Sequence, residues 1–341
     1  MDPDILSEEH ILELILDRDV QIRDLQTCLA PSTRRMKPIN AWLHGKPGTG
    51  KTTVAKFLLN KLQEESRVRG VYVNCWQKNT FYSILDAALT DLRVLCGEER
   101  NTSSKLDILR KHLKGEPFIL ILDEVDSLPL SERNTALYNF SDFGNLGLIC
   151  ISESRFLMVT LEDRIKSRLN AQIIEFPPYT FSDLTEILKS RAGVALTPDT
   201  WCNKTLEKIA ELAQGDARIG IQTLRSAANF AERECSRFIE KRHIEKGFQN
   251  MRNLKRIYAL KNLTEHHQIL YHMIKDQEKI ISKELWKAYL ERCQKDKLIP
   301  IAKRTFDHYL SQLARLGFID CKRARVRGKV HLFKVTQPME A

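Results

Sequence analysis

The sequence predicts an α/β protein with a three-layer domain around a parallel sheet, then a helical lid, then a C-terminal winged helix. Continuous apolar runs such as residues 117–122 are typical of strands buried on both faces of a parallel sheet. Such runs alternate with helical stretches up to residue 179, which indicates three layers. Beyond residue 180 helical periodicity takes over, until a two-strand signal flanks a basic turn near the end.

Five strands are expected in the first domain, with helices between them. The expected strands are residues 39–44, 70–75, 117–122, 147–152 and 171–176. The expected helices of this domain are residues 5–30, a stretch that begins near Lys51, and residues 81–95. The expected lid helices are residues 182–191, 198–213, 217–235 and 243–258.

The C-terminal segment has the order of elements of a winged helix. Helices are expected at residues 264–276, 282–295 and 302–316. Strands at residues 317–321 and 330–335 follow and flank the basic turn. The predicted domains are residues 1–179, 180–258 and 259–341.

A glycine-rich loop directly after the first strand predicts a nucleotide site. It fits the template G-x-x-x-x-G-K-[ST], whose backbone N–H groups bind phosphates at the start of a helix. The expected ATP or ADP ligands are Gly45, Lys46, Pro47, Gly48, Thr49, Gly50, Lys51, Thr52 and Thr53. Lys51 is expected to reach the β- and γ-phosphates, and Thr52 to hold Mg²⁺. A chance glycine-rich turn is the alternative, which the flanking strand and helix disfavour.

Two carboxylates follow the third expected strand. Asp123 is placed where it can meet the Mg²⁺ held by Thr52, and Glu124 where it can orient or activate a water. An acidic surface turn is the alternative, but the apolar strand and the preceding phosphate loop favour catalysis.

Composition and charge limit the class of protein. No apolar run approaches the length that a bilayer requires, and no secretory signal is recognised, so a protein of the cytosol, or of the nucleus if the organism has one, is expected. Eight cysteines without a C-x-x-C spacing argue against zinc clusters. Residues 255–341 hold 19 Lys and Arg against 9 Asp and Glu, which accounts for the whole net charge of +10. This basic module favours nucleic-acid binding, and a solvated basic surface is the alternative.

Arginines at two further positions suit a nucleotide site. Arg218 opens a lid helix, from which it can reach a γ-phosphate. Arg164 and Arg168 precede the last strand of the first domain, and either can reach the nucleotide of a neighbouring subunit. An exposed salt-bridge partner is the alternative for any single arginine.

Taken together, these motifs resemble the AAA+ ATPases, and specifically the archaeal origin-recognition and cell-division-control replication initiators. Further segments similar to the family are Arg18-Asp19, residues 176–180, residues 187–191 and residues 310–318. The resemblance implies that Tyr179 and Arg191 also contact the nucleotide. It implies ATP-dependent binding of double-stranded origin DNA by a chromosome-associated cytoplasmic protein that recruits or loads the replicative helicase. A monomer in solution that assembles on DNA with related initiator subunits is expected.

The chain departs from the family after its fourth strand, where an asparagine usually helps to position the water. Here the sequence is Ile151-Ser152-Glu153-Ser154. An acidic side chain would repel the γ-phosphate, so slow hydrolysis and a switch-like role are expected, with Ser152 or Ser154 as substitutes. Arg168 is favoured over Arg164 as the arginine acting in trans, because its Ser-Arg pair resembles the finger motif of clamp loaders.

The winged helix provides the expected DNA contacts. Base-facing candidates at the start of its recognition helix are Lys303, Arg304 and Thr305. Candidates for phosphate or minor-groove contacts in the wing are Lys322, Arg323, Arg325, Arg327 and Lys329. The resemblance implies a second DNA contact from the first domain, near residues 76–100. The alternative function is a signalling or helper ATPase whose winged helix contacts protein.

Overall fold

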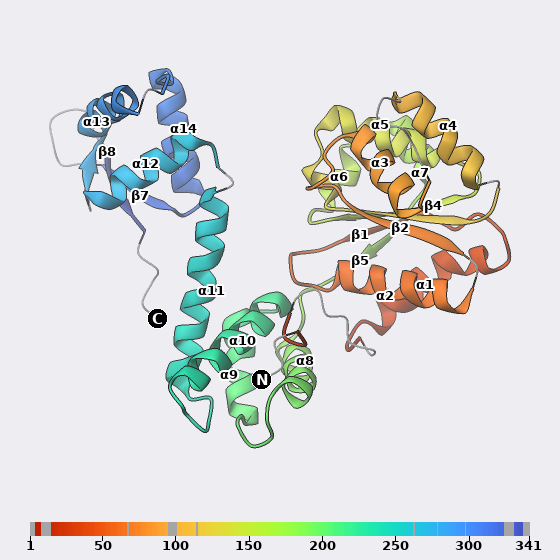
Figure 1. The fold of residues 1–341 in the computed structure, drawn as a ribbon, viewed down its shortest axis with the longest axis horizontal. Coiled ribbons are helices and arrows are strands. Elements are labelled where there is room, and N and C mark those ends of the chain that lie inside the picture. Colours follow the sequence, from red (N-terminus) through yellow and green to blue (C-terminus); the bar gives the residue numbers. More distant parts are fainter. Residues whose placement is uncertain are drawn as a thin grey trace. The chain divides into compact units, whose positions relative to one another are not determined.

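The computed structural model describes residues 4–7, 15–66, 68–94, 101–113, 115–261, 263–277, 279–296, 298–323 and 331–336. The chain divides into two compact units, Met1–Ile244 and Glu245–Ala341 (Figure 1). In the described residues, no helix is both long and apolar enough to cross a membrane.

A five-stranded parallel sheet forms the centre of the first unit. Its strands are β1 (Ala41–His44), β2 (Arg69–Asn74), β3 (Phe118–Asp123), β4 (Leu146–Ser152) and β5 (Gln172–Glu175). Their order across the sheet is β2-β3-β4-β1-β5, and every pair is parallel. All five expected strands are confirmed, with ends that differ by one or two residues.

Helices cover both faces of this sheet, as the three-layer prediction requires (Figure 1). On one face α1 (Asp19–Thr33) and α2 (Lys51–Glu65) enclose a core with Ile119 and Ile121 of β3. On the other face a second core includes Leu120 and Leu122. The helices of that face are α3 (Phe81–Asp91), α4 (Thr102–Leu113), α5 (Leu130–Ser141) and α7 (Asp163–Leu169). Two short helices, η1 (Val125–Ser127) and α6 (Phe156–Val159), follow β3 and β4.

The expected helix at residues 5–30 is wrong in its first part. Residues 4–7 form a turn, residues 8–14 lie outside the described residues, and α1 begins only at Asp19. Asp17 has a φ of 56°, a left-handed conformation that interrupts a right-handed helix. The helical spacing of the apolar residues did not reveal this interruption.

The lid consists of helices that share their own core. They are α8 (Phe181–Ala195), α9 (Asn203–Ala213) and α10 (Ala217–Arg233). Thr180 and Asp183 form a capping box at the start of α8, and the Asp216 carboxylate accepts from the Ile219 N–H at the start of α10. The expected boundary after residue 258 falls inside α11 (Lys241–Lys261), whereas the compact units divide after Ile244. The three-domain division therefore stays a prediction.

The second unit has the element order of a winged helix. It contains α12 (Glu265–Asp276), β6 (Ile280–Ile281), α13 (Ser282–Lys295), α14 (Lys303–Arg315), β7 (Ile319–Arg323) and β8 (His331–Val335). The strands form an antiparallel sheet in the order β6-β8-β7 over a core that includes Tyr289 and Phe306. β7 starts two residues later than expected, because Gly317 adopts a left-handed turn with a φ of 73°.

The side chain of Asn40, directly before β1, forms hydrogen bonds to Leu148 of β4 and to Leu169 at the end of α7. Its buried side chain donates to the Leu169 carbonyl (2.6 Å) and accepts from the Leu148 N–H (2.8 Å). Asn40→Ala should lower the free energy of unfolding by about 2–3 kcal/mol, because it leaves both buried groups unpaired. Urea unfolding followed by circular dichroism measures this. The exposed Asn60 on α2 is the matched control, and Asn60→Ala should change stability by less than about 0.5 kcal/mol. Equal effects of the two substitutions would contradict this role of Asn40.

Candidate functional site

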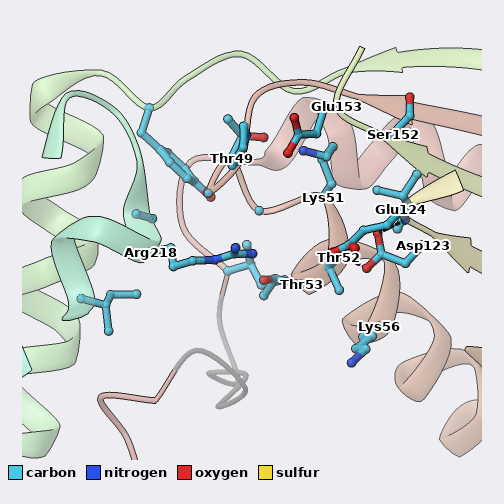
Figure 2. A pocket seen from close by; sticks show the side chains of 18 of the residues that line it. Thr49, Lys51, Thr52, Thr53, Lys56, Asp123, Glu124, Ser152, Glu153 and Arg218 are labelled. Carbon is cyan, nitrogen blue, oxygen red and sulfur yellow. Dashed lines mark hydrogen bonds between the residues drawn. The ribbon is translucent and has the colours of Figure 1, made fainter. Parts of the chain in front are cut away.

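A cavity of about 350 Å³ lies in the first unit, where β1, β3 and β4 end beside the lid (Figure 2). It is lined by the loop after β1, the residues after β3 and β4, and the start of α10. The expected site residues that line it are Pro47, Gly48, Thr49, Gly50, Lys51, Thr52, Thr53, Asp123, Glu124, Tyr179, Arg191 and Arg218. The structure therefore brings most of the expected nucleotide site together.

The loop requires glycine at positions where the backbone approaches other groups. Gly48 has a φ of 72°, and a Cβ there would lie 1.8 Å from Asp216 Oδ1. Gly50 has a φ of 87°, and a Cβ there would lie 2.6 Å from the Tyr179 hydroxyl. Gly50 is also the N-cap of α2 and has no side chain that could satisfy the first N–H groups of this helix. Those N–H groups are suited to a phosphate at the cavity.

Lys51 is 8% exposed and turns its ammonium onto the loop itself. Its Nζ donates to the carbonyls of Gly45 (2.7 Å) and Lys46 (2.9 Å). Gly45 and Lys46, the two remaining expected loop residues, are not among the residues that line the cavity. Burial lowers the pKa of Lys51, while the charges of Asp123 and Glu153 oppose that shift.

Asp123 ends β3 and is 4% exposed. Its Oδ2 accepts from the Thr52 hydroxyl (2.7 Å) and from the Tyr72 hydroxyl (2.8 Å), while Oδ1 accepts from the Glu124 N–H (2.9 Å). A carboxylate beside a threonine hydroxyl forms an oxygen donor set that suits Mg²⁺. The residues present therefore fit a magnesium nucleotide. The contribution of Tyr72 was not predicted from the sequence.

Glu124 lines the cavity from an uncommon backbone conformation, with a φ of 54° and a ψ of 46°. Burial, followed by the charges of Asp123 and Asp126, raises the pKa of its carboxyl, and Arg218 acts in the opposite direction. A carboxylate with a raised pKa accepts a proton more readily, which suits the activation of a water.

The residues after β4 form the part of the cavity where the sequence departs from the family pattern. Ser152 is buried, and its hydroxyl accepts from the Trp42 indole N–H (2.9 Å) and donates to the Ser154 carbonyl (3.1 Å). The Glu153 N–H donates to Asp126 Oδ2 (3.0 Å). Figure 2 shows the Glu153 side chain beside Lys51. The Ser152 hydroxyl therefore already forms hydrogen bonds with neighbouring residues. Glu153 lines the cavity, where its carboxylate adds a negative charge.

Arg18 connects the loop to the junction between sheet and lid. Its Nε donates to the Thr49 carbonyl (3.0 Å), and its Nη2 donates to the Pro177 carbonyl (2.8 Å). Its guanidinium also lies 3.6 Å from the centroid of the Tyr179 ring. Arg18 is 4% exposed, so these contacts are sheltered from water. Tyr179, expected to contact nucleotide, is held at the cavity wall by this stacking.

The two expected lid arginines, Arg218 and Arg191, both line the cavity, and they come from different helices. Arg218 extends from α10 across the cavity toward the start of α2 (Figure 2). Arg191 of α8 lines the cavity and donates through Nη1 to the carbonyls of Ile5 and Ser7 (3.4 Å for Ser7). Arg191 therefore also fixes the N-terminal turn against the lid.

Arg168 and Arg164 lie on α7, away from the cavity of their own chain. Arg168 pairs with Asp142 (2.8 Å) and lies 4.3 Å from the Tyr138 ring centroid. Arg164 pairs with Glu162 (2.7 Å). Their expected role in trans requires a second subunit and stays a prediction.

The expected DNA-binding residues lie in the second unit. Lys303 pairs with Asp307 (3.1 Å), and its ammonium lies 4.2 Å from the centroid of the Phe306 ring. Thr305 is half-buried, whereas Arg304 is exposed. The exposed residues that share a face of α14 with Arg304 are Asp307, His308, Ser311 and Arg315.

The wing is described only in part. Lys322 is exposed on β7, and Arg323 ends that strand in register with His331. Arg325, Arg327 and Lys329 lie outside the described residues.

Two domain families match the chain. An AAA domain matches residues 38–160, which hold the loop and both carboxylates. A Cdc6 AAA+ ATPase-type lid domain matches residues 185–249.

Whole-chain relatives extend this match. The ORC1-type DNA replication protein of Thermoplasma volcanium is 29% identical, over 99% of this chain and 89% of its own length. ORC1-type DNA replication protein 15 of Haloarcula marismortui is 26% identical, over 98% of this chain and 89% of its own length. The fold is similar to that in the structure of the Aeropyrum pernix ORC1 protein in complex with DNA, with a TM-score of 0.84. The two sequences are 26% identical, and the match covers 99% of this chain and 94% of that one. In sequence and in fold, the chain is similar to the archaeal origin recognition complex and Cdc6 family of AAA+ proteins.

Proposed function

We propose that the protein is an ATP-dependent DNA replication initiator that binds double-stranded origin DNA and helps to recruit or load the replicative helicase. The observation that carries this proposal is the cavity in which the phosphate loop, Asp123, Glu124 and Arg218 converge. Relatives named as DNA replication proteins, and a similar ORC1 protein whose structure is a complex with DNA, support the biological role.

ATP or ADP with Mg²⁺ is the proposed ligand of the cavity. The N–H groups at the start of α2 and the Lys51 ammonium would bind the phosphates, and Thr52 with Asp123 would hold the cation. The cation would neutralise charge on the phosphates when bound. Glu124 would accept a proton from the attacking water, and Arg218 would contact the γ-phosphate from the lid.

Slow hydrolysis is proposed because Glu153 adds a negative charge where the family usually has an asparagine. Its repulsion of a γ-phosphate opposes the positive charges of Lys51 and Arg218. Such a site is suited to a switch, in which the bound nucleotide sets the position of the lid through Arg218 and through the Arg18 contacts.

The proposed DNA contacts come from the winged helix and from the AAA+ domain. On α14, Arg304, His308, Ser311 and Arg315 form an exposed face that suits a major groove. The basic wing would contact phosphate or a narrow minor groove. On DNA, Arg168 would reach the nucleotide of a related initiator subunit, and a chromosome-associated protein of the cytoplasm is proposed.

Substitutions in the cavity should separate nucleotide binding from turnover. Lys51→Ala should weaken ATP binding by about two orders of magnitude, because loss of a buried charge contact costs about 2–5 kcal/mol. Glu124→Gln should keep ATP affinity but reduce turnover by about 100-fold or more. Calorimetric ATP titration and phosphate release measure these. Lys61→Ala, at an exposed pair with Glu65 on the same helix, is the matched control and should leave both unchanged. A wild-type turnover no faster than that of Glu124→Gln would contradict hydrolysis at this site.

Substitutions in the winged helix should weaken DNA binding alone. Arg304→Ala should cost about 1–3 kcal/mol, and Arg325→Ala should reduce the slope of affinity against salt by about 1. Gel shifts with duplex origin DNA at several salt concentrations measure both. Lys208→Ala, on lid helix α9, removes the same charge elsewhere and should have little effect. Unchanged low-salt affinity of the Arg304→Ala, Arg325→Ala double variant would contradict the proposed DNA contact, and its ATP binding should survive.

A further inference from the structure

Tyr72 belongs to none of the expected motifs, yet its hydroxyl contacts the carboxylate at the centre of the cavity. β2 and β3 are parallel, and Tyr72 is in register with Ile121. Asp123 lies two positions beyond Ile121 and therefore on the same face of the sheet. That face packs against α2, since Ile121 belongs to the core that α2 covers. Tyr72 thus reaches Asp123 diagonally between neighbouring strands.

The hydrogen bonds to Asp123 fix the orientation of its carboxylate. Oδ2 accepts from Thr52 on α2 (2.7 Å) and from Tyr72 on β2 (2.8 Å). Oδ1 accepts from the Glu124 N–H (2.9 Å). A carboxylate has about four acceptor positions, so Oδ2 is filled by its two donors while Oδ1 keeps one position. The Tyr72 hydroxyl thus helps to determine which oxygen stays open.

The phenol is itself held in place. Lys56, one helical turn after Thr52, places its ammonium 3.8 Å from the centroid of the Tyr72 ring. The partly buried ring packs against the core beneath α2. The Asp123 carboxylate thus receives hydrogen bonds from Thr52 of α2, from Tyr72 of β2 and from the Glu124 N–H after β3, and each of them limits its rotation.

We propose that Tyr72 is a positioning residue for Mg²⁺, whose hydroxyl orients the Asp123 carboxylate toward the cation that Thr52 and Asp123 would hold. This inference rests on the proposed function, because it requires a magnesium nucleotide in the cavity. The competing explanation is that Tyr72 only fills the core beneath α2. In that case the ring is sufficient and the hydroxyl is dispensable.

Tyr72→Phe distinguishes these explanations, because it keeps the ring and removes the hydroxyl. The affinity of the whole chain for a fluorescent ATP analogue is measured across a Mg²⁺ titration and in EDTA. The Mg²⁺ concentration for half-maximal tightening should rise about tenfold, since loss of a group that orients a metal ligand typically costs about 10- to 100-fold. Affinity in EDTA should stay within about twofold of the wild type, because the phosphate contacts of the loop remain.

Tyr138→Phe is the matched control. It makes the same change on α5, where the ring lies beneath the Arg168 guanidinium, and it should leave the Mg²⁺ dependence unchanged. Identical Mg²⁺ dependence of wild type and Tyr72→Phe would overturn the inference while the proposed function stands. An equal loss of affinity with and without Mg²⁺ would also overturn it, since that loss reports damage to the loop. A wild type that binds no better than Lys51→Ala would overturn both proposals.

Discussion

The parallel register of β1, β3 and β4 is the constraint on which the site depends. Leu43 and His44 of β1 pair with Ile151 and Ser152 of β4, and β3 lies on the other side of β4. The phosphate loop, Asp123 and the β4–α6 connection therefore meet at one edge of the sheet. Every residue of these three strands is buried, so packing on both faces holds the register.

The loop is bonded to the start of α10 and, through Arg18, to the segment that precedes α8. The Ala217 N–H at the start of α10 donates to the Gly48 carbonyl (3.1 Å), and the Asp216 carboxylate lies beside Gly48. Before α8, Arg18 donates to both the Thr49 carbonyl and the Pro177 carbonyl. A change of the loop on binding phosphate must therefore be accommodated by the lid, which is the physical argument for the proposed switch.

Local patterns in the sequence predicted the parts of the fold and site that depend on neighbouring residues. Continuous apolar runs predicted the five strands, and fixed spacing predicted the phosphate loop. Contacts between distant residues were not predictable in this way, as with Arg18 and Thr49 or with Tyr72 and Asp123. Helix α4 was also missed, since Lys105 occupies one of its buried positions, where it pairs with Asp86. A pattern of apolar residues counts such a lysine as exposed.

In the proposed function, a bound nucleotide controls the binding of origin DNA. The most direct test is a footprint of the purified protein on candidate origins of its own genome, with ATP, with ADP and without nucleotide. We expect discrete protected sites whose extent or strength differs between the nucleotide states. Protection that is the same in all three states, or that is no stronger at candidate origins than elsewhere, would contradict it.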